Sequence, residues 1–306
     1  MVKILLFGKN GQVGKELQTS LNKNFELVSL SKNSINHCGD FENIDGIIKT
    51  IRNINPDIII NAAAFTQVDK AETEIRKNYK INHLTPSAIA TELGGTKKLL
   101  IHYSSDYIFS GTGTLPWKES DDKNPLNEYG KAKLLGETEI KKSSCKFIIL
   151  RPSWIYSSNK NNFLSTIVKL ANEKKYLDVI DDQIGVPTSS SFVSKITLKF
   201  IDRYTNDLKS DKFINQCYNI VPDGEASWFN IAVEILKQLN KNNIKTNLNI
   251  KNIRRVKSIN YMQSATRPYN SRLNTMKVKK LLLEDFPKWE DDVELVIKKI
   301  INSHVS

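Results

Sequence analysis

The sequence has little of what disulfide-stabilised and zinc-binding proteins need. Its 306 residues include only three cysteines, Cys38, Cys145 and Cys217, which lie far apart and form no CxxC pair. The four histidines have no ligand-like spacing. This set argues against a disulfide framework and against a zinc site, and it fits a reducing compartment. We therefore expect no catalytic metal.

Long apolar runs are also absent. No stretch approaches the roughly 18 apolar residues that a membrane span requires. The opening run, MVKILLF, is too short for the hydrophobic region of a signal peptide, and it leads directly into a glycine motif. There is no internal repeat, low-complexity linker or long block of like charge. We expect a cytoplasmic protein with no membrane partner.

The composition is that of a globular protein with excess positive charge. Hydrophobic residues make up 40% and charged residues 25%, and the chain is long enough for one large or two interlocked domains. A net charge of +12 is compatible with nucleic acid, an anionic membrane or an anionic substrate. Because the lysines are spread along the whole chain, we interpret the charge mainly as compositional bias and expect no nucleic-acid partner.

The first half of the chain alternates short apolar strands with amphipathic helices. Strand and helix taking turns, with nearly continuous apolar strands, predicts an α/β fold with a doubly wound, Rossmann-like parallel sheet. The predicted strands are residues 2–7, 25–30, 57–61, 98–104 and 146–151, and the predicted helices are residues 11–23, 44–55, 85–95 and 129–142.

The pattern becomes looser after Arg151. Residues 161–175 and 228–240 predict helices, and residues 176–180 and 217–221 predict short strands, with loops punctuated by Pro or Gly. We divide the chain into a dinucleotide-binding domain over residues 1–152 and a smaller α+β lobe, mainly for substrate, over residues 153–306. Some later segments are expected to return to the sheet.

A glycine motif joins the first predicted strand to the first predicted helix. Gly8, Gly11 and Gly14 stand at GxxGxxG spacing. A tight turn, a close approach of backbone to pyrophosphate, and close helix–sheet packing each leave no room for a Cβ. The helix N-terminus then offers free N–H groups to the phosphates. The motif predicts dinucleotide binding, with a purely structural turn as the alternative.

The residues after the second predicted strand bear on the choice of cofactor. At this place a carboxylate usually accepts a hydrogen bond from a ribose hydroxyl of NAD, but here the strand is followed by Ser31 and Lys32. Either this is a simple loop, or Lys32, Lys9 or both accommodate a 2′-phosphate, which makes NADPH at least as good a candidate as NADH. Asp40 and Phe41 suit an adenine ring, by polar contact and by packing.

Small and polar side chains follow the third and fourth predicted strands. Residues 62–64 are alanines that let a cofactor pass close, and residues 104–106 supply two hydroxyls and an acid. In an open parallel sheet, ligands collect at the carboxyl ends of the strands. Tyr129 and Lys133 lie one helical turn apart in the next crossover, so we expect them at the same crevice.

Ser105, Tyr129 and Lys133 form a candidate catalytic set. The free pKa of tyrosine is about 10, so a phenol exchanges protons poorly at neutral pH unless a cation stabilises the phenolate. Lys133 can supply that cation and bind ribose hydroxyls, and Ser105 can polarise a substrate carbonyl. The Tyr–Lys pair alone is equally compatible with a wet helix face. It gains weight because the glycine turn and the serine loop precede it in the expected order.

These motifs resemble those of extended short-chain dehydrogenases/reductases that modify nucleotide sugars. The segments CGDF, RPSWIY, NNF, DDQIGVPT and RPYNSRLN are similar, more narrowly, to those of the dTDP-4-dehydrorhamnose reductase family, and the similarity runs from Lys3 to about Trp289. The resemblance implies a nucleotide-sugar substrate and the reduction of the C4 ketone of dTDP-4-dehydro-β-L-rhamnose with NAD(P)H.

The resemblance also implies roles for individual residues. Tyr129 is expected to give the proton to the new C4 hydroxyl, Lys133 to hold the cofactor ribose and lower the pKa of Tyr129, and Ser105 to bond the carbonyl. Ser105, Asp106, Tyr129 and Trp154 are expected to contact the substrate, with Arg267 as the candidate for its diphosphate. The implied cofactor contacts are Gly8, Gly11, Gln12, Val13, Ser31, Lys32, Asp40, Phe41, Ala63, Ala64, Phe65, Thr66, Tyr103, Tyr129 and Lys133.

Two departures and several alternatives stay open. Phe65 stands where many relatives have a polar residue or histidine, and Ser31 with Lys32 replaces an acid. Both departures affect the preference between NADPH and NADH.

Relatives can use Mg²⁺ to hold a dimer, so a structural Mg²⁺ bound through Glu16 and a homodimer are further expectations. The alternative functions are another nucleotide-sugar epimerase, dehydratase or reductase of the superfamily, and a non-catalytic regulatory subunit resembling the methionine adenosyltransferase beta subunit. The intact catalytic set argues against the regulatory role.

Overall fold

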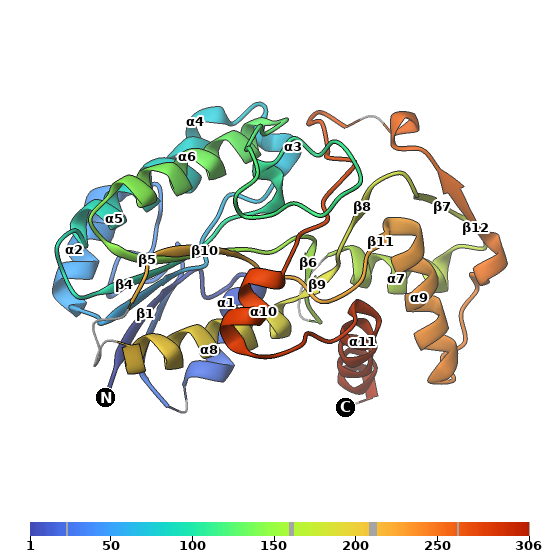
Figure 1. Cartoon of the computed structure of the whole chain (residues 1–306). Coiled ribbons are helices and arrows are strands. Elements are labelled where there is room, and N and C mark those ends of the chain that lie inside the picture. The colour runs from blue at the N-terminus through green and yellow to red at the C-terminus, as the bar shows by residue number, and fades with distance from the viewer. Residues whose placement is uncertain (23, 159–161, 208–212, 262, 306) are drawn as a thin grey trace.

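A six-stranded parallel sheet forms the centre of the protein (Figure 1). The structure is a computed structural model that describes residues 1–22, 24–158, 162–207, 213–261 and 263–305. The strand order is β10-β5-β4-β3-β1-β2. The strands are β1 (Lys3–Phe7), β2 (Glu26–Leu30), β3 (Ile58–Asn61), β4 (Leu99–Tyr103), β5 (Lys146–Arg151) and β10 (Gln216–Asn219).

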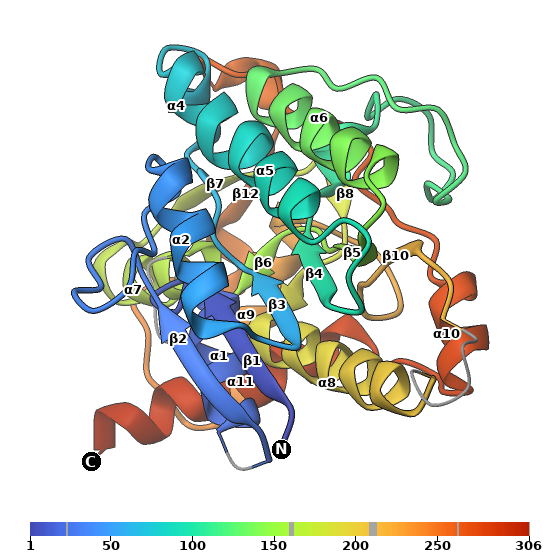
Figure 2. The ribbon, with the colours of Figure 1, turned by 90° about the vertical axis from the view of Figure 1, so that its left-hand side faces the viewer.

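Helices cover both faces of this sheet because its strands are apolar on both sides. One face packs on α2 (Ile44–Ile54), α5 (Thr85–Glu92) and α6 (Glu128–Lys142), and the other on α1 (Gln12–Leu21) and α8 (Ser190–Asp207) (Figure 2). Neighbouring residues of a strand point to opposite faces, so Leu5 joins the core under α2 whereas Leu6 joins the core under α1. The predicted doubly wound α/β fold is confirmed.

The predicted strands and helices of the first half are present, with small differences at their ends. The helix predicted over residues 85–95 ends at Glu92, ahead of Gly94 and of Gly95, whose φ of +71° is typical of a helix end. The helix predicted over residues 11–23 ends at Leu21, and residue 23 lies outside the described part of the chain.

The second half forms a lobe with its own core (Figure 1). Three helices pack together in it: α7 (Phe163–Glu173), α9 (Trp228–Lys241) and α11 (Trp289–Val305). Residue 161, in the segment NNF, is outside the described residues. Short strand pairs support the lobe: β6 (Ile155–Tyr156) with β9 (Thr188–Ser189), β7 (Leu177–Ile180) with β12 (Ile253–Val256), and β8 (Ile184–Gly185) with β11 (Ala226–Ser227).

Shorter elements connect these layers. They are α3 (Val68–Ala71), α4 (Ile75–Tyr79), the π-helix η1 (Lys80–Leu84), the 3₁₀ helices η2 (Asp106–Ile108), η3 (Ile250–Asn252) and η4 (Ser258–Asn260), and α10 (Met276–Leu282). Among the described residues, no helix has both the length and the apolarity to cross a lipid bilayer.

Two late segments return to the sheet. The strand predicted over residues 217–221 is β10, which pairs with β5 at the sheet edge instead of lying in the lobe. Helix α8 packs on α1, and the hydroxyl of Ser194 donates to that of Ser20 at 3.0 Å. A boundary at residue 152 therefore does not separate the two hydrophobic cores, because β10 and α8 belong to the core of the sheet. The assignment of cofactor binding to residues 1–152 and of substrate binding mainly to residues 153–306 remains a prediction.

The strand order places a crevice at the carboxyl ends of β1 and β3. The chain runs from β1 to β2 on one side and then crosses to β3 on the other side of β1. Connections that leave in opposite directions open a space between the two strands, and ligands of open α/β sheets bind there. The glycine turn after β1 and the alanines after β3 both lie at this point.

Candidate active site

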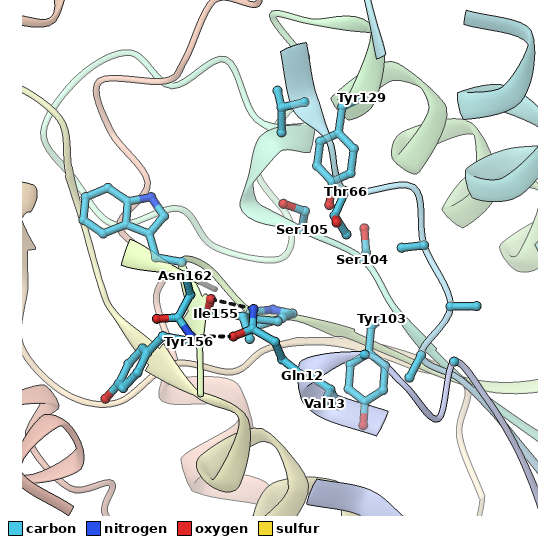
Figure 3. Close-up of a pocket in the computed structure, with 18 of the residues that line it drawn as sticks. Gln12, Val13, Thr66, Tyr103, Ser104, Ser105, Tyr129, Ile155, Tyr156 and Asn162 are labelled. Carbon is cyan, nitrogen blue, oxygen red and sulfur yellow. Dashed lines mark hydrogen bonds between the residues drawn. The ribbon is translucent and has the colours of Figure 1, made fainter. Parts of the chain in front are cut away.

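A cavity of about 800 Å³ lies at the carboxyl ends of the strands, between the sheet and the lobe (Figure 3). Its walls come from the glycine turn, the loops after β2, β3 and β4, the start of α6, and the lobe. Most of the sequence-predicted residues line it: Gly8, Gly11, Gln12, Val13, Ser31, Lys32, Asp40, Phe41, Ala63, Ala64, Thr66, Tyr103, Ser105, Asp106, Tyr129, Lys133 and Trp154.

At Gly8 and Gly14 the glycine turn is packed too closely for a residue with a Cβ. Gly8 has a φ of +86°, and a Cβ added to it would lie 2.5 Å from the carbonyl carbon of Ala62. A Cβ on Gly14 would lie 2.1 Å from the carbonyl oxygen of Gly8. Gly11 precedes α1, and no described side chain caps that helix. The first N–H groups of α1 are thus available to an anion such as a pyrophosphate.

Gln12 ties the glycine turn to the lobe (Figure 3). Its Oε1 accepts hydrogen bonds from Ser157 Oγ at 2.9 Å and Asn162 Nδ2 at 3.0 Å, and its Nε2 donates to the carbonyl of Ile155 at 3.3 Å. Neither Ser157 nor Asn162 was predicted as a site residue from the sequence. The segment NNF, noticed only as a family motif, was the one signal for Asn162.

The loop after β2 holds Lys32 between two carboxylates. Its ammonium hydrogen-bonds Glu42 and lies 3.8 Å from Asp40 Oδ2. The hydrogen bond with Glu42 is the main reason that the pKa of Lys32 is raised, although burial opposes it slightly. Of the two candidate lysines, only Lys32 lines the cavity.

Tyr129 lies in the first turn of α6, and its phenol points toward Ser105 and Thr66 (Figure 3). The turn is fixed by Asn127, whose Oδ1 accepts from the backbone N–H of Gly130 at 2.8 Å. The ring of Tyr107 packs edge-on against Tyr129, with centroids 5.6 Å apart. The structure therefore brings Tyr129 and Ser105 to one wall of the cavity.

Lys133 follows one turn later and is buried. Its Nζ donates to the carbonyl oxygen of Tyr103 at 2.9 Å. Burial lowers the pKa of Lys133 to about 8, and the negative charge of Glu137 opposes this shift. The phenol of Tyr103 itself points away toward α8, where it bonds Thr197 at 2.6 Å. Tyr103 thus meets the cavity with its backbone and ring rather than its hydroxyl.

The pKa of Tyr129 is raised, which differs from the lowering expected from Lys133. Burial is the largest cause and the charge of Asp106 adds to it, while the hydrogen bond with Ser105 works in the opposite direction. Burial also raises the pKa of Asp106 to about 6, against a 3.0 Å hydrogen bond from Ser105. The phenol is therefore neutral at physiological pH and holds a proton that it can donate.

Two predicted site residues do not line the cavity. The backbone N–H of Phe65 donates a hydrogen bond to Asn82 Oδ1 at 3.2 Å, and its carbonyl accepts one from Asn82 Nδ2 at 2.9 Å. The ring of Phe65 packs in the small apolar cluster around Tyr129. The guanidinium of Arg267 makes two hydrogen bonds of 2.5 Å to the carboxylate of Asp69. Neither residue is among those that line this cavity, and the roles of both in binding stay predictions.

The lobe side of the cavity contains an aromatic pair of which sequence analysis found only one member. Trp154 has φ of 43°, a conformation that bulky residues rarely adopt, and its ring stacks on Trp228 at a centroid distance of 3.9 Å. Trp228 donates from Nε1 to Gln183 Oε1 at 3.1 Å. Its position at the start of α9 gives no sequence signal for a cavity, because only the lobe fold brings it there.

The described residues offer no evident metal site. Within them, no group of three or more His, Cys, Asp or Glu side chains is arranged to hold a metal ion. Glu16, expected as a possible Mg²⁺ contributor, lies 3.8 Å from the ammonium of Lys299 on α11. The proposed Mg²⁺ therefore has no ligand set in this part of the chain.

Comparison with known proteins identifies the family. The sequence model of the RmlD substrate binding domain matches residues 2–302. The dTDP-4-dehydrorhamnose reductase of Escherichia coli strain K12 is 39% identical over 302 residues, which cover 99% of both chains. The chain belongs to the dTDP-4-dehydrorhamnose reductase family.

Solved structures of the dTDP-4-dehydrorhamnose reductase family have the same fold. The protein from Clostridium acetobutylicum is 29% identical, with a TM-score of 0.87, and the match covers 98% of this chain and all 100% of the other. The Bacillus anthracis protein, solved in complex with NADP, is 28% identical with a TM-score of 0.86 and the same coverage. The family resemblance inferred from sequence is confirmed, and the chain is an oxidoreductase of the extended short-chain type.

Proposed function

We propose that the protein reduces the C4 ketone of dTDP-4-dehydro-β-L-rhamnose to the hydroxyl of dTDP-β-L-rhamnose, with NADPH or NADH. The observation that carries this proposal is the placement of Tyr129, Lys133 and Ser105 on one wall of the cavity that the glycine turn enters. The family supplies the substrate: its members compared above are named for this reaction. A cytoplasmic location and a homodimer remain predictions.

The residues of the cavity fit a dinucleotide. When bound, the nicotinamide supplies the hydride that reaches C4 of the sugar. The uncapped start of α1 would hold the pyrophosphate, and the alanines after β3 would leave space for the cofactor to lie against the backbone. Lys133, held at the carbonyl of Tyr103, binds the ribose hydroxyls.

Tyr129 and Ser105 complete the reduction. Ser105 donates a hydrogen bond to the ketone oxygen, so that negative charge can develop there as C4 accepts the hydride. Tyr129 gives its phenolic proton to that oxygen, and the products are the C4 hydroxyl and the oxidised cofactor. Burial raises the pKa of Tyr129, so the phenol is a weak acid that stays protonated until hydride arrival makes the C4 oxygen a stronger base than the phenolate. Asp106 and Trp154, which line the same cavity, contact the sugar.

The proposed reaction is tested by cofactor oxidation. The purified protein is mixed with NADPH or NADH and dTDP-4-dehydro-L-rhamnose, and absorbance at about 340 nm is followed. We expect oxidation that depends on the sugar nucleotide. If neither cofactor is oxidised, the reductase proposal fails, and the regulatory-subunit alternative becomes the one to pursue. If the cofactor is recycled and the sugar is epimerised or dehydrated instead, the protein is another nucleotide-sugar enzyme of the superfamily.

The pairing of Lys32 with Glu42 sets an expectation for cofactor preference. Glu42→Gln removes the charge that pairs with Lys32 and so leaves the ammonium of Lys32 free to meet a 2′-phosphate. We expect the ratio of kcat/KM for NADPH to that for NADH to rise about two- to fivefold, the scale of a partly exposed ion pair. Lys32→Gln is the matched control and should lower the ratio. The same change in both variants would mean that neither charge meets the 2′-position.

A further inference from the structure

Asp69 and Arg267, 198 positions apart, form a polar junction beside the cavity wall, in which Arg267 is largely buried and Asp69 is partly exposed. Arg267 Nη1 and Nη2 each donate to one carboxylate oxygen of Asp69 at 2.5 Å. The backbone N–H of Ala265 donates to Asp69 Oδ1 at 3.1 Å, and the carbonyl of Ala265 accepts from Arg267 Nη1 at 2.8 Å. The hydrogen bonds from Arg267 are the main reason that the pKa of Asp69 is lowered to about 2. The guanidinium fork is therefore filled by a carboxylate of the chain itself.

This junction touches the catalytic helix in two places. Asn127, whose Oδ1 caps α6, donates from Nδ2 to the carbonyl of Thr266 at 2.8 Å, next to Arg267. Burial opposes the rise in the pKa of Arg267, whereas Asp69 and then Tyr107 raise it, so the phenol of Tyr107 lies near the guanidinium. The ring of Tyr107 in turn packs edge-on against Tyr129 at an interplanar angle of 81°. The loop around Arg267 thus supports both the backbone and the ring of Tyr129.

The junction also reaches the cofactor side of the cavity. Asp69 lies in α3, directly after the loop whose residues Ala62, Ala63, Ala64 and Thr66 line the cavity. Its neighbour Val68 is itself a lining residue. Arg267 belongs to the lobe half of the chain. The ion pair therefore joins the cofactor loop, the start of α6 and the lobe at one point.

We propose that Asp69 and Arg267 form a positioning clasp that fixes Tyr129 relative to the substrate ketone, and that Arg267 is not a ligand of the diphosphate. The catalytic part of this inference rests on the proposed function. Arg267 acts through Tyr107 and Asn127, since its own side chain does not line the cavity. A proton donor must sit within hydrogen-bond reach of its acceptor, and a displacement of about 1 Å can cost on the order of 100-fold in rate.

Steady-state kinetics of Asp69→Asn, Arg267→Lys and a double variant Asp69→Asn/Arg267→Gln test the clasp. We expect each single change to lower kcat on the order of 10-fold with little change in KM, and the double change to be no worse than the singles, because the two residues act as one unit. Binding of dTDP, measured by calorimetry, should stay within about twofold of the original value.

A second arginine–carboxylate pair provides the control. Arg254 makes the same two-pronged contact to Asp178 at 2.6 and 3.0 Å, but its side chain is 68% exposed, against 16% for Arg267, and the pair lies in the lobe between β12 and β7. Arg254→Lys should leave kcat unchanged. If Arg267→Lys weakens dTDP binding and raises KM while Asp69→Asn does neither, Arg267 is a diphosphate ligand and the clasp is wrong.

Hydrogen exchange separates the clasp from the proposed reaction. In Asp69→Asn, the amides at the start of α6, including that of Gly130, should exchange faster than in the unmodified protein, and Arg254→Lys should not change them. This readout does not need turnover. If the unmodified protein oxidises no cofactor, the proposed function fails, and exchange still decides the clasp. Unchanged exchange at α6 in Asp69→Asn overturns it.

Discussion

Replacing Tyr129 by phenylalanine is expected to lower kcat by at least ~100-fold, the usual contribution of a general acid. The ring, its packing on Tyr107 and the cap of α6 survive this change, so only the proton donor is lost. Cofactor affinity, measured by quenching of protein fluorescence, should be nearly unchanged. A large loss of kcat with retained cofactor binding would identify the phenol as a participant in the chemical step.

Tyr79 offers a matched control for this experiment. Its hydroxyl donates to Glu128 at 3.0 Å in the same region, but it does not line the cavity. Tyr79→Phe should therefore keep kcat within about twofold, as expected for a residue that meets no reacting atom. If Tyr129→Phe turned over at a near-normal rate, the proton would have to come from another group, although the reaction itself could still be the one proposed.

Glu137→Ala is expected to destabilise the protein by about 3–5 kcal/mol, the scale for removing one partner of a buried ion pair. Arg151 donates from Nε and Nη2 to Glu137 at 2.8 and 2.6 Å, and both side chains are fully buried. Without Glu137, the buried guanidinium keeps a 3.5 Å hydrogen bond to the carbonyl of Glu119 and its position over the Phe109 ring, but it loses its carboxylate partner. Urea unfolding followed by circular dichroism measures this loss.

The control for Glu137 lies two residues further along the same helix. Glu139 pairs with Lys142 at 3.0 Å on the exposed side of α6, so Glu139→Ala should change the free energy of unfolding by no more than about 0.5 kcal/mol. The double change Glu137→Met/Arg151→Met should recover most of the loss, because no buried charge then remains unpaired. Equal effects of Glu137→Ala and Glu139→Ala would contradict the interpretation.

The same ion pair predicts how stability depends on pH. Burial tends to raise the pKa of Glu137, but the charge and hydrogen bonds of Arg151 outweigh it, so the net pKa is lowered. A carboxyl whose pKa is lower when folded stabilises the protein above its unfolded value of about 4.3, and this contribution is lost as the pH falls through the folded value. We therefore expect Glu137→Ala to flatten the decline of stability on the acid side of pH 4.

The parts of the site that could be predicted from sequence are those set by short-range rules. The glycine spacing, the position after a strand end, and the four-residue interval between Tyr129 and Lys133 each fix a local geometry. The net pKa shift of Tyr129 was not predictable in this way, because it depends on how deeply the completed fold buries the phenol.

Contacts between distant segments escaped prediction for the same reason. Arg267 was expected at a diphosphate because an arginine fork suits phosphate oxygens, but the carboxylate that fills the fork is contributed by α3. Trp228 has the composition of an ordinary helix start, and only the packing of α9 on the lobe brings it onto Trp154. Such pairings depend on topology, which residue type and spacing do not encode.

Because α8 and β10 return to the sheet, the residues predicted to bind the cofactor and the residues that must fold together are not the same part of the chain. A fragment ending at residue 152 would leave the edge of β5 without β10, and the apolar side of α1 without α8. Both surfaces attract other chains when uncovered. The dinucleotide-binding half is therefore not expected to be an autonomous unit: the segment from β6 to α8, which includes α7 of the lobe, separates β5 from β10 in the chain and must be synthesised before the sheet can be completed.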